Sequence, residues 1–360
     1  MKHDIVGSFL LPESLVEARN QYLAGAIDIQ QLRKTEDEAI TRLVARQIEA
    51  GLSEVTSGEF RRTYWDKDFW FDLEGIQRER VESGHLYQPV DPFTDLMRFT
   101  GRIAYNPTHP FFEDFTFLRN TADESISCRQ TLPSPANLYL EILALNDGRL
   151  EQTYPVPHQL IDDIAEAYNK TIRHFYKIGC RHIQIDDTSC GLLCDDNYTK
   201  RLLQGGVDLI SLHDRLISLF NNSISGLPAD MELSLYLSGG DTIVPEWEFL
   251  EYPDNIMPKV LSRVNVGKFF MPFNIGNDYQ IEILRHIPDG KKVVLGLTDA
   301  HSPLSERISD ILDTVDMASA IVRPGNLSVS PKTGFKLSSY ASRGLTYEDQ
   351  WGKIAMLKTI

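Results

Sequence analysis

The sequence predicts a single α/β domain over residues 1–360, folded as a (β/α)8 barrel of the TIM type. Short apolar strands alternate with helical stretches along the chain, and this alternation is typical of βαβ units around a parallel sheet. A length of 360 residues is normal for one such barrel with insertions. Hydrophobic residues make up 42% of the chain, so we expect a large core and an ordered protein.

The first elements show the pattern. Asp4–Phe9 is predicted to be a strand and Glu13–Ala24 a helix, because Pro12 is tolerated at a helix start and Gly25 is a stop signal. A second helix is predicted at Asp28–Ala50. Later helices include Gln159–Ile178 and Leu209–Phe220, and the later predicted strands are Glu54–Glu59, Gln130–Ser134, His182–Asp186, Glu232–Ser238, Glu248–Glu251, Val293–Leu297 and Leu327–Ser330.

The stretch Met97–Asn120 interrupts this alternation. Runs rich in β-forming residues at Phe99–Tyr105 and Phe112–Leu118 flank a turn at Asn106-Pro107, so we predict an antiparallel excursion after the second strand. An open doubly wound sheet is the alternative fold. It is disfavoured because no glycine-rich phosphate loop follows the first strand.

Charge and composition exclude several classes of partner. The net charge of -15 disfavours nucleic acid and anionic membranes, whereas a small-molecule substrate needs only local complementary groups. Four cysteines in 360 residues indicate reduced thiols rather than a disulfide framework. The first residues contain no apolar signal region, and no apolar run is long enough to cross a bilayer. We therefore expect a cytoplasmic protein; the sequence does not indicate its oligomeric state.

Polar residues at predicted strand ends are the candidates for chemistry, because barrel active sites lie at the carboxyl ends of the strands. Ser8 follows the first strand in a turn. Glu59 ends the second strand beside Arg61 and Arg62, a group that suits the ammonium and carboxylate of an amino acid. A salt-bridged surface loop is the alternative interpretation of this charge cluster.

The strand His182–Asp186 carries a further carboxylate. Alternation places Ile183 and Ile185 on one face and Gln184 and Asp186 on the other. Because the outer face of a barrel strand packs on helices, we expect Asp186 to point into the barrel, where it would suit a cationic amine. Asp187 is expected to point away, and its alternative role is the N-cap of the next helix.

The loop after Val293–Leu297 contains Asp299 and His301. Histidine titrates near neutral pH and can deliver a proton to a leaving group. The alternative is a loop histidine that caps the helix starting near Pro303.

Taken in order, seven segments resemble the catalytic barrel of cobalamin-independent methionine synthase, most closely its short form without an N-terminal barrel. The segments are VGSF (6–9), EVTSGEFRRTYW (54–65), TLPSP (131–135), QIDDTS (184–189), FLEY (249–252), VVLGL (293–297) and LSVSPKTGF (327–335). Their order and spacing, rather than any one segment, make the resemblance specific.

The resemblance implies transfer of a methyl group from methyltetrahydrofolate to the sulfur of homocysteine, with zinc binding the thiol. Ser8, Glu59 and Asp186 would hold the amino-acid backbone. His301 matches the histidine of the family's Asp-x-His-Ser-Pro motif, the proton donor to the departing folate nitrogen, and Asp299 would support it.

The implied zinc ligands are mostly replaced. The family's His-x-Cys strand aligns with Leu235-Tyr236-Leu237, its late cysteine with Thr333, and only its glutamate remains, as Glu251. One carboxylate makes a weak zinc site, so we do not expect these positions to bind zinc.

Two further features bear on cofactors. Cys190 and Cys194 have a spacing that suits metal ligands or a redox pair, although cysteines among leucines are more often core residues. The tryptophan that stacks on the pterin in the full-length family falls near Tyr139–Glu141, where this chain has none, so Tyr139 and Trp65 are the candidate rings for methyltetrahydrofolate.

Three functional hypotheses follow. The first is an S-methyltransferase, or a related enzyme of carbon–sulfur chemistry, that keeps the amino-acid pocket. The second is a non-catalytic paralogue that binds a sulfur amino acid or another small molecule. The third is a metal-independent lyase or hydrolase on the same barrel. The match of His301 favours an enzyme over a binding protein.

Overall fold

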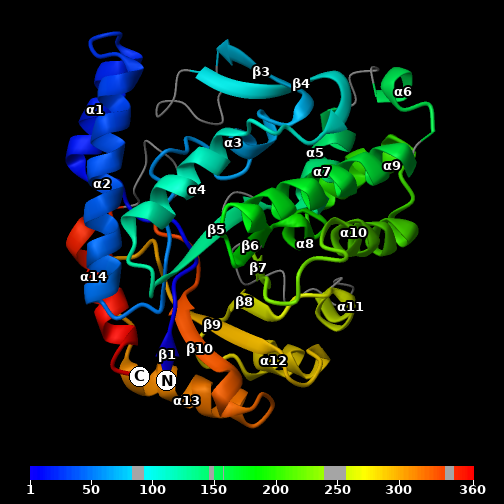
Figure 1. The fold of residues 1–360 in the computed structure, drawn as a ribbon. Coiled ribbons are helices and arrows are strands. Elements are labelled where there is room, and N and C mark those ends of the chain that lie inside the picture. The colour runs from blue at the N-terminus through cyan, green and yellow to red at the C-terminus, as the bar shows by residue number, and fades with distance from the viewer. Residues whose placement is uncertain (83–92, 146–149, 157, 239–256, 337–343) are drawn as a thin grey trace.

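A computed structural model describes residues 1–82, 93–145, 150–156, 158–238, 257–336 and 344–360. Its main element is a curled eight-stranded sheet in the order β1-β10-β9-β8-β7-β6-β5-β2, in which neighbouring strands run parallel (Figure 1). The strands are β1 (Lys2–His3), β2 (Glu54–Val55), β5 (Ser127–Pro133), β6 (His182–Asp187), β7 (Glu232–Leu237), β8 (Lys268–Pro272), β9 (Lys292–Thr298) and β10 (Leu327–Pro331).

The segments that follow the two edge strands meet each other. The backbone N–H of Phe9 donates to the carbonyl of Gly58 at 3.2 Å, and the Thr56 hydroxyl donates to the carbonyl of Gly7 at 2.7 Å. The sheet therefore curls round until its edges come together, which is consistent with the predicted TIM-type barrel.

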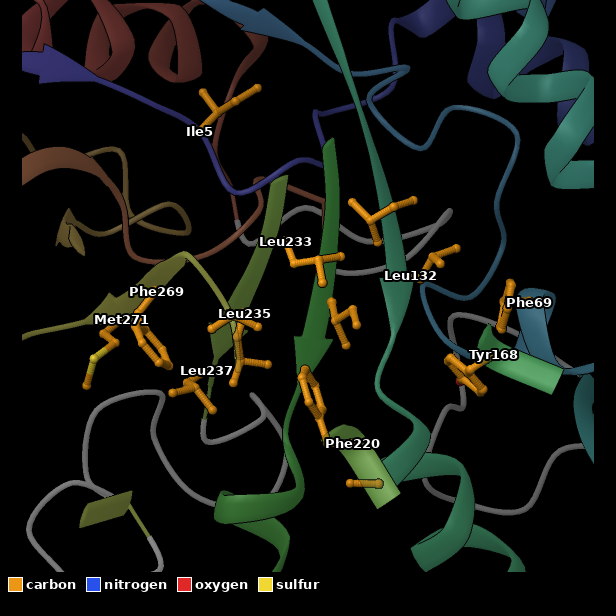
Figure 2. Close-up of a cluster of buried hydrophobic side chains, with 14 of the residues drawn as sticks. Ile5, Phe69, Leu132, Tyr168, Phe220, Leu233, Leu235, Leu237, Phe269 and Met271 are labelled. Atoms are coloured by element: carbon orange, nitrogen blue, oxygen red, sulfur yellow. The ribbon is translucent and has the colours of Figure 1, made fainter. Parts of the chain in front are cut away.

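The two faces of the sheet bury different side chains. Leu233, Leu235 and Leu237 of β7 belong to the large apolar cluster between the sheet and the outer helices, and Figure 2 shows them near Phe269 of β8 and Phe220. A second, small cluster lies on the inner face and consists of Val6, Tyr236, Phe270 and Val294.

Helices cover the outside of the sheet (Figure 1). The second helix begins with a capping box, because Asp28 accepts from the backbone N–H of Gln31 at 2.8 Å and Gln31 accepts from that of Asp28 at 2.9 Å. The helices are α1 (Glu13–Leu23), α2 (Ile29–Glu49), α3 (Lys67–Trp70), α4 (Pro110–Thr121), α5 (Pro135–Leu145), α6 (Leu150–Thr153), α7 (His158–Lys177), α8 (Ser189–Leu192), α9 (Asp196–Gln204), α10 (Leu209–Ser223), α11 (Met257–Arg263), α12 (Asp278–Glu282), α13 (Ile308–Ser319) and α14 (Tyr347–Leu357).

The antiparallel excursion after the second strand is a small hairpin of β3 (Glu74–Glu82) and β4 (Phe93–Ala104). The prediction that Phe112–Leu118 is part of it was wrong, because these residues lie in α4. That helix starts with Pro110 at its first turn, and the ring of His109 accepts the backbone N–H of Phe111 at 3.2 Å.

Two strand predictions also need correction, and one strand was not predicted. Asp4–Phe9 follows β1 instead of forming it, and β2 ends at Val55, well before Glu59. The strand β8 was missed, while the predicted strand Glu248–Glu251 lies outside the described residues. No helix in the described part of the chain is both long enough and apolar enough to span a membrane.

Candidate active site

The predicted site residues gather at the carboxyl ends of the strands. Ser8 and Glu59 follow β1 and β2, Asp186 lies near the end of β6, and His301 follows β9. The segment after β10, residues 333–336, contacts three of these four residues, and it organises the site.

Glu59 is buried, with 5% of its surface exposed. One oxygen of its carboxylate, Oε1, accepts from Thr131 Oγ1 at 2.8 Å and from Arg62 Nη1 at 3.2 Å. Its backbone has a φ of 58°, in the left-handed region that costs a non-glycine residue energy. Gly7 allows the loop after β1 to lie close to Thr131, because a Cβ at position 7 would be only 2.8 Å from the Thr131 methyl carbon.

Lys336 holds the strained turn from the other side. Its ammonium donates to the carbonyl of Glu59 at 2.8 Å and to that of Arg62 at 3.2 Å. Burial lowers the pKa of Lys336 to about 7, although the negative charge of Glu59 opposes this shift. Sequence reasoning missed Lys336, because the groups it binds are backbone carbonyls that leave no pattern in the sequence.

Ser8 is locked to the same segment. A backbone N–H of Lys336 donates to Ser8 Oγ at 3.3 Å, and that of Phe335 donates to the Ser8 carbonyl at 3.1 Å. Gly334 approaches Ser8 so closely that no side chain fits between them. Sequence reasoning also missed this role of Gly334.

Asp186 faces the barrel interior, as alternation along β6 predicts. Its Oδ1 accepts from Gln184 Nε2 at 2.7 Å, and the same amide nitrogen donates to the carbonyl of Val6 at 2.7 Å. Burial raises the pKa of Asp186 to about 8, and the nearby charge of Glu59 adds to the effect. The group is therefore mostly protonated at neutral pH in the free protein.

Asp187 points to the outer face. Its carboxylate accepts from Ser134 Oγ at 2.5 Å and from the backbone N–H of Ser189, the first residue of α8, at 2.7 Å. Asp187 therefore stabilises the start of α8, although the N-cap residue is Thr188, one position later. This role is close to the N-cap role that the sequence suggested as an alternative.

The His301 ring lies against the segment after β10. Its Nε2 is 3.2 Å from the carbonyl of Gly334 and 3.4 Å from Thr333 Oγ1. Asp299 accepts from the backbone N–H of His301 at 2.8 Å, and its own N–H donates to Glu306 at 2.6 Å. Asp299 thus supports the backbone of the loop through a contact that does not involve the imidazole ring.

Arg61 is engaged away from the Glu59 carboxylate. Its guanidinium pairs with Asp37 and Asp114, and Phe117 lies 4.9 Å below it. The neighbouring Arg62 is the arginine in the site, donating to the carbonyl of Thr131 at 2.7 Å.

The four cysteines pack as small apolar residues. Cys128, Cys180 and Cys190 are buried in the large core cluster, and Cys194 packs against it. Burial raises the pKa of the Cys194 thiol to about 11 and that of Cys190 well above its ordinary value. Protonated thiols are poor metal ligands and nucleophiles.

Zinc fits the described residues poorly. No group of three or more His, Cys, Asp and Glu side chains with metal-binding geometry occurs in the described ranges. Glu251 lies outside them, in residues 239–256, whose sequence contains carboxylates but neither histidine nor cysteine. Leu235 and Leu237, with which the family's His-x-Cys pair aligns, pack in the large outer cluster, whereas Tyr236 between them lies in the inner one.

The two aromatic rings predicted as candidates for stacking on folate differ in solvent exposure. Tyr139 is 4% exposed, and its hydroxyl bonds to Arg215, so it offers no open ring face. Trp65 is half-buried, and its carbonyl accepts from Arg62 at 3.4 Å. Of the two, only Trp65 has an accessible surface.

A surface hollow of about 230 Å³ lies elsewhere, lined by residues such as Arg285, Lys291 and Arg323. Lys291 directly precedes β9, so this hollow is at the amino ends of the strands. It is therefore separate from the site at the carboxyl ends.

Comparisons with known proteins show which sequences and folds the chain resembles. No family model matches the sequence. The chain is 30% identical over 354 residues to YxjG of Bacillus subtilis, an uncharacterised protein, covering 98% of this chain and 91% of the relative. A solved structure from Listeria monocytogenes, assigned provisionally to the vitamin-B12-independent methionine synthases, is 29% identical with a TM-score of 0.75, and the match covers 100% of this chain and 96% of the other.

The chain belongs to the cobalamin-independent methionine synthase family. A further member, from Shewanella sp. W3-18-1 in complex with selenomethionine, has the same fold at 19% identity and a TM-score of 0.70, with 99% of this chain and 95% of the other covered. The strand-end residues described above thus lie in a methionine-synthase-like barrel.

Proposed function

We propose that this chain is a methyltransferase-family enzyme that holds the amino-acid part of a small substrate between Ser8, Glu59 and Asp186. The observation that carries the proposal is the pair of buried carboxylates in the barrel mouth. Burial and, in addition, the nearby charge of Glu59 raise the pKa of Asp186, so holding both carboxylates charged without a cation is unfavourable. A substrate ammonium bound beside them would offset this cost.

Unsatisfied polar atoms also support a ligand in the interior. Gln184 Oε1 and Thr298 Oγ1 are buried and have no hydrogen-bond partner among the described residues. Buried polar atoms nearly always have a hydrogen-bond partner, so we expect a ligand or a water molecule to bond to these two atoms. The Shewanella relative's complex with selenomethionine motivates a sulfur amino acid as the first ligand to test.

The proposed reaction moves a methyl group from nitrogen to sulfur. The N–CH3 bond of a methyltetrahydrofolate-type donor breaks, an S–CH3 bond forms on a homocysteine-type thiol, and the thiol proton is lost. His301 would place a proton on the departing nitrogen, so the net transfer of one proton from sulfur to nitrogen balances the reaction. No step is assigned to a metal, because the described donors do not fit zinc.

Methionine formation from homocysteine and methyltetrahydrofolate tests the proposal. We expect product with the wild-type protein and a fall in kcat of about 100-fold or more in His301→Asn, with unchanged amino-acid affinity. Activity unaffected by Ser8→Ala, Glu59→Gln and His301→Asn would contradict it.

A second candidate is an amino-acid-binding protein without catalytic activity. Hydroxyl side chains at positions facing the site, such as Thr333, favour it, because the metal that activates the thiol in the family would lack ligands there. The same assay separates the two candidates: this one predicts tight amino-acid binding with no product.

A further inference from the structure

The inner face of β7 leads to an inference beyond the proposed function. Strand register pairs Tyr236 with Asp186 of β6, and Tyr236 contacts Phe270 and Val294 in the inner cluster. The ladder continues past the end of β7, since the backbone N–H of Ser238 donates to the carbonyl of Asp187 at 3.0 Å. Alternation therefore places Ser238 on the same inner face as Tyr236, one layer nearer the strand ends.

Two metal ligands spaced as His-x-Cys on a strand must share the inner face. Leu235 and Leu237 cannot be these positions, because they pack in the outer cluster. Ser234 is also inner, but its hydroxyl binds His182 Nε2 at 2.8 Å near the amino ends of the strands. The inward pair nearest the site is therefore Tyr236 and Ser238.

The third position comes from the segment after β10. Thr333 is buried, and its hydroxyl lies 3.4 Å from His301 Nε2. Phenol and alkyl hydroxyl groups are neutral at physiological pH, whereas protein zinc sites are built from thiolate, imidazole and carboxylate groups.

We infer that Tyr236, Ser238 and Thr333 occupy the three positions from which zinc-dependent relatives present their histidine and cysteine ligands. In this chain they form a neutral hydroxyl surface, and the acceptor atom of the substrate is held by hydrogen bonds from protein groups instead of a metal ion. The inference depends on strand register, so it can be tested without any assay of activity.

The test restores the ligand types at these positions. Full-length wild-type protein, purified without chelators or a metal-binding tag, is compared with Tyr236→His/Ser238→Cys/Thr333→Cys by elemental analysis and by competition with a chromogenic zinc chelator. We expect no stoichiometric zinc in the wild type. In the triple variant we expect about one zinc per chain, bound at least about 100-fold more tightly, since it has three family-type ligands.

A matched control variant places the same two strand ligands on the outer face of β7 instead of the inner face. Leu235→His/Leu237→Cys/Thr333→Cys introduces identical ligand types at the outward positions and is expected to gain no zinc. One tightly bound zinc per wild-type chain would overturn the inference. So would a folded inward variant that binds no zinc, or a control that binds it equally well.

A milder pair of variants covers the case in which the triple variants do not fold. Ser238→Cys/Thr333→Cys is titrated with Co²⁺ and compared with Leu237→Cys/Thr333→Cys. Two thiolates that share the inner face give a cobalt–thiolate charge-transfer band, which we expect in the first variant and not in the second. The reverse result would overturn the inference.

Discussion

Gly334 packs against Ser8 so closely that a Cβ atom at position 334 would lie 2.0 Å from the Ser8 hydroxyl oxygen. This contact joins the loop after β1 to the segment after β10, and the carbonyl of Gly334 also lies 3.2 Å from His301 Nε2. The two sides of the site therefore cannot shift independently.

Gly334→Ala is expected to force these segments apart and to destabilise the protein by about 1–3 kcal/mol, the usual cost of overpacking. Denaturant unfolding measures the change, and Ser8→Gly/Gly334→Ala should recover most of it by removing the clashing hydroxyl. The control is Gly325→Ala, where an added Cβ meets nothing within 4 Å. A loss in Gly334→Ala no larger than in this control would contradict the packing account.

Lys336 positions Glu59 through the backbone carbonyls that it binds. Lys336→Met should weaken amino-acid binding by about tenfold, since hydrogen bonds from a charged donor contribute roughly 1.5–3 kcal/mol. Lys336→Arg should restore part of the affinity. Calorimetric titration measures the effect, with Lys292→Met as an exposed control lysine paired to Glu232. Equal affinities in all of these variants would exclude a positioning role.

The raised pKa of Asp186 predicts proton release when an ammonium ligand binds. With a pKa of about 8, the free group is mostly protonated at pH 7, and a bound ammonium favours the carboxylate. Close to one proton per ligand should therefore be released at pH 7, and affinity should rise with pH up to about 8. Calorimetry in buffers of different ionisation enthalpy measures the release. Asp186→Asn should abolish it, and undiminished release in that variant would assign it to another group.

A buried charge cluster at the amino ends of the strands makes a separate prediction. The fully buried Arg129 pairs with Asp4 at 3.0 Å and Glu54 at 3.4 Å. Arg129→Met leaves these carboxylates without their central partner, so we expect a loss of about 3–5 kcal/mol in the free energy of unfolding. Arg102→Met removes an exposed ion pair and should cost much less, because solvent screens such pairs. Similar losses for the two variants would show that burial is not the cause.

The same cluster predicts acid sensitivity. Burial alone would raise the pKa of Glu54, but His182 and Arg129 outweigh burial and hold the pKa well below its usual range. The stabilisation is therefore present above the unfolded pKa near 4 and is lost as pH falls below it. The unfolding free energy of the wild type should drop more steeply between about pH 4 and pH 2 than that of Arg129→Met. Parallel pH profiles would contradict this assignment.

Sequence patterns predicted the elements that have local signals. The long helix predicted at Asp28–Ala50 corresponds to α2, and alternation along β6 predicted that Asp186 points inward. The strand β8 was missed because Phe269, Phe270 and Met271 are all buried, which removes the alternation that marks a half-buried strand. In α4, aromatic and threonine residues suggested a strand, whereas tertiary packing of Phe112 and Phe115 stabilises a helix.

The site was predictable where residues follow strands. The carboxyl-end rule placed Ser8, Glu59 and His301 at one end of the sheet, where the structure has them. It treated Arg61 and Arg62 as one group, and only the fold shows that Arg61 pairs with Asp37 and Asp114 whereas Arg62 contacts Glu59. The sequence aligned the metal positions with Leu235 and Leu237 on β7, because an alignment alone cannot distinguish two registers that bury opposite faces.

The most direct test of the central claim is calorimetric binding of L-methionine and L-homocysteine beside their des-amino analogues. The two buried carboxylates predict that the wild type binds the amino acids at least about 100-fold more tightly than the analogues, because the analogues cannot make charge-assisted hydrogen bonds to Glu59 and Asp186. Glu59→Gln should lose most of this discrimination. Equal binding of amino acids and des-amino analogues by the wild type would contradict the claim that Glu59 and Asp186 form an ammonium site.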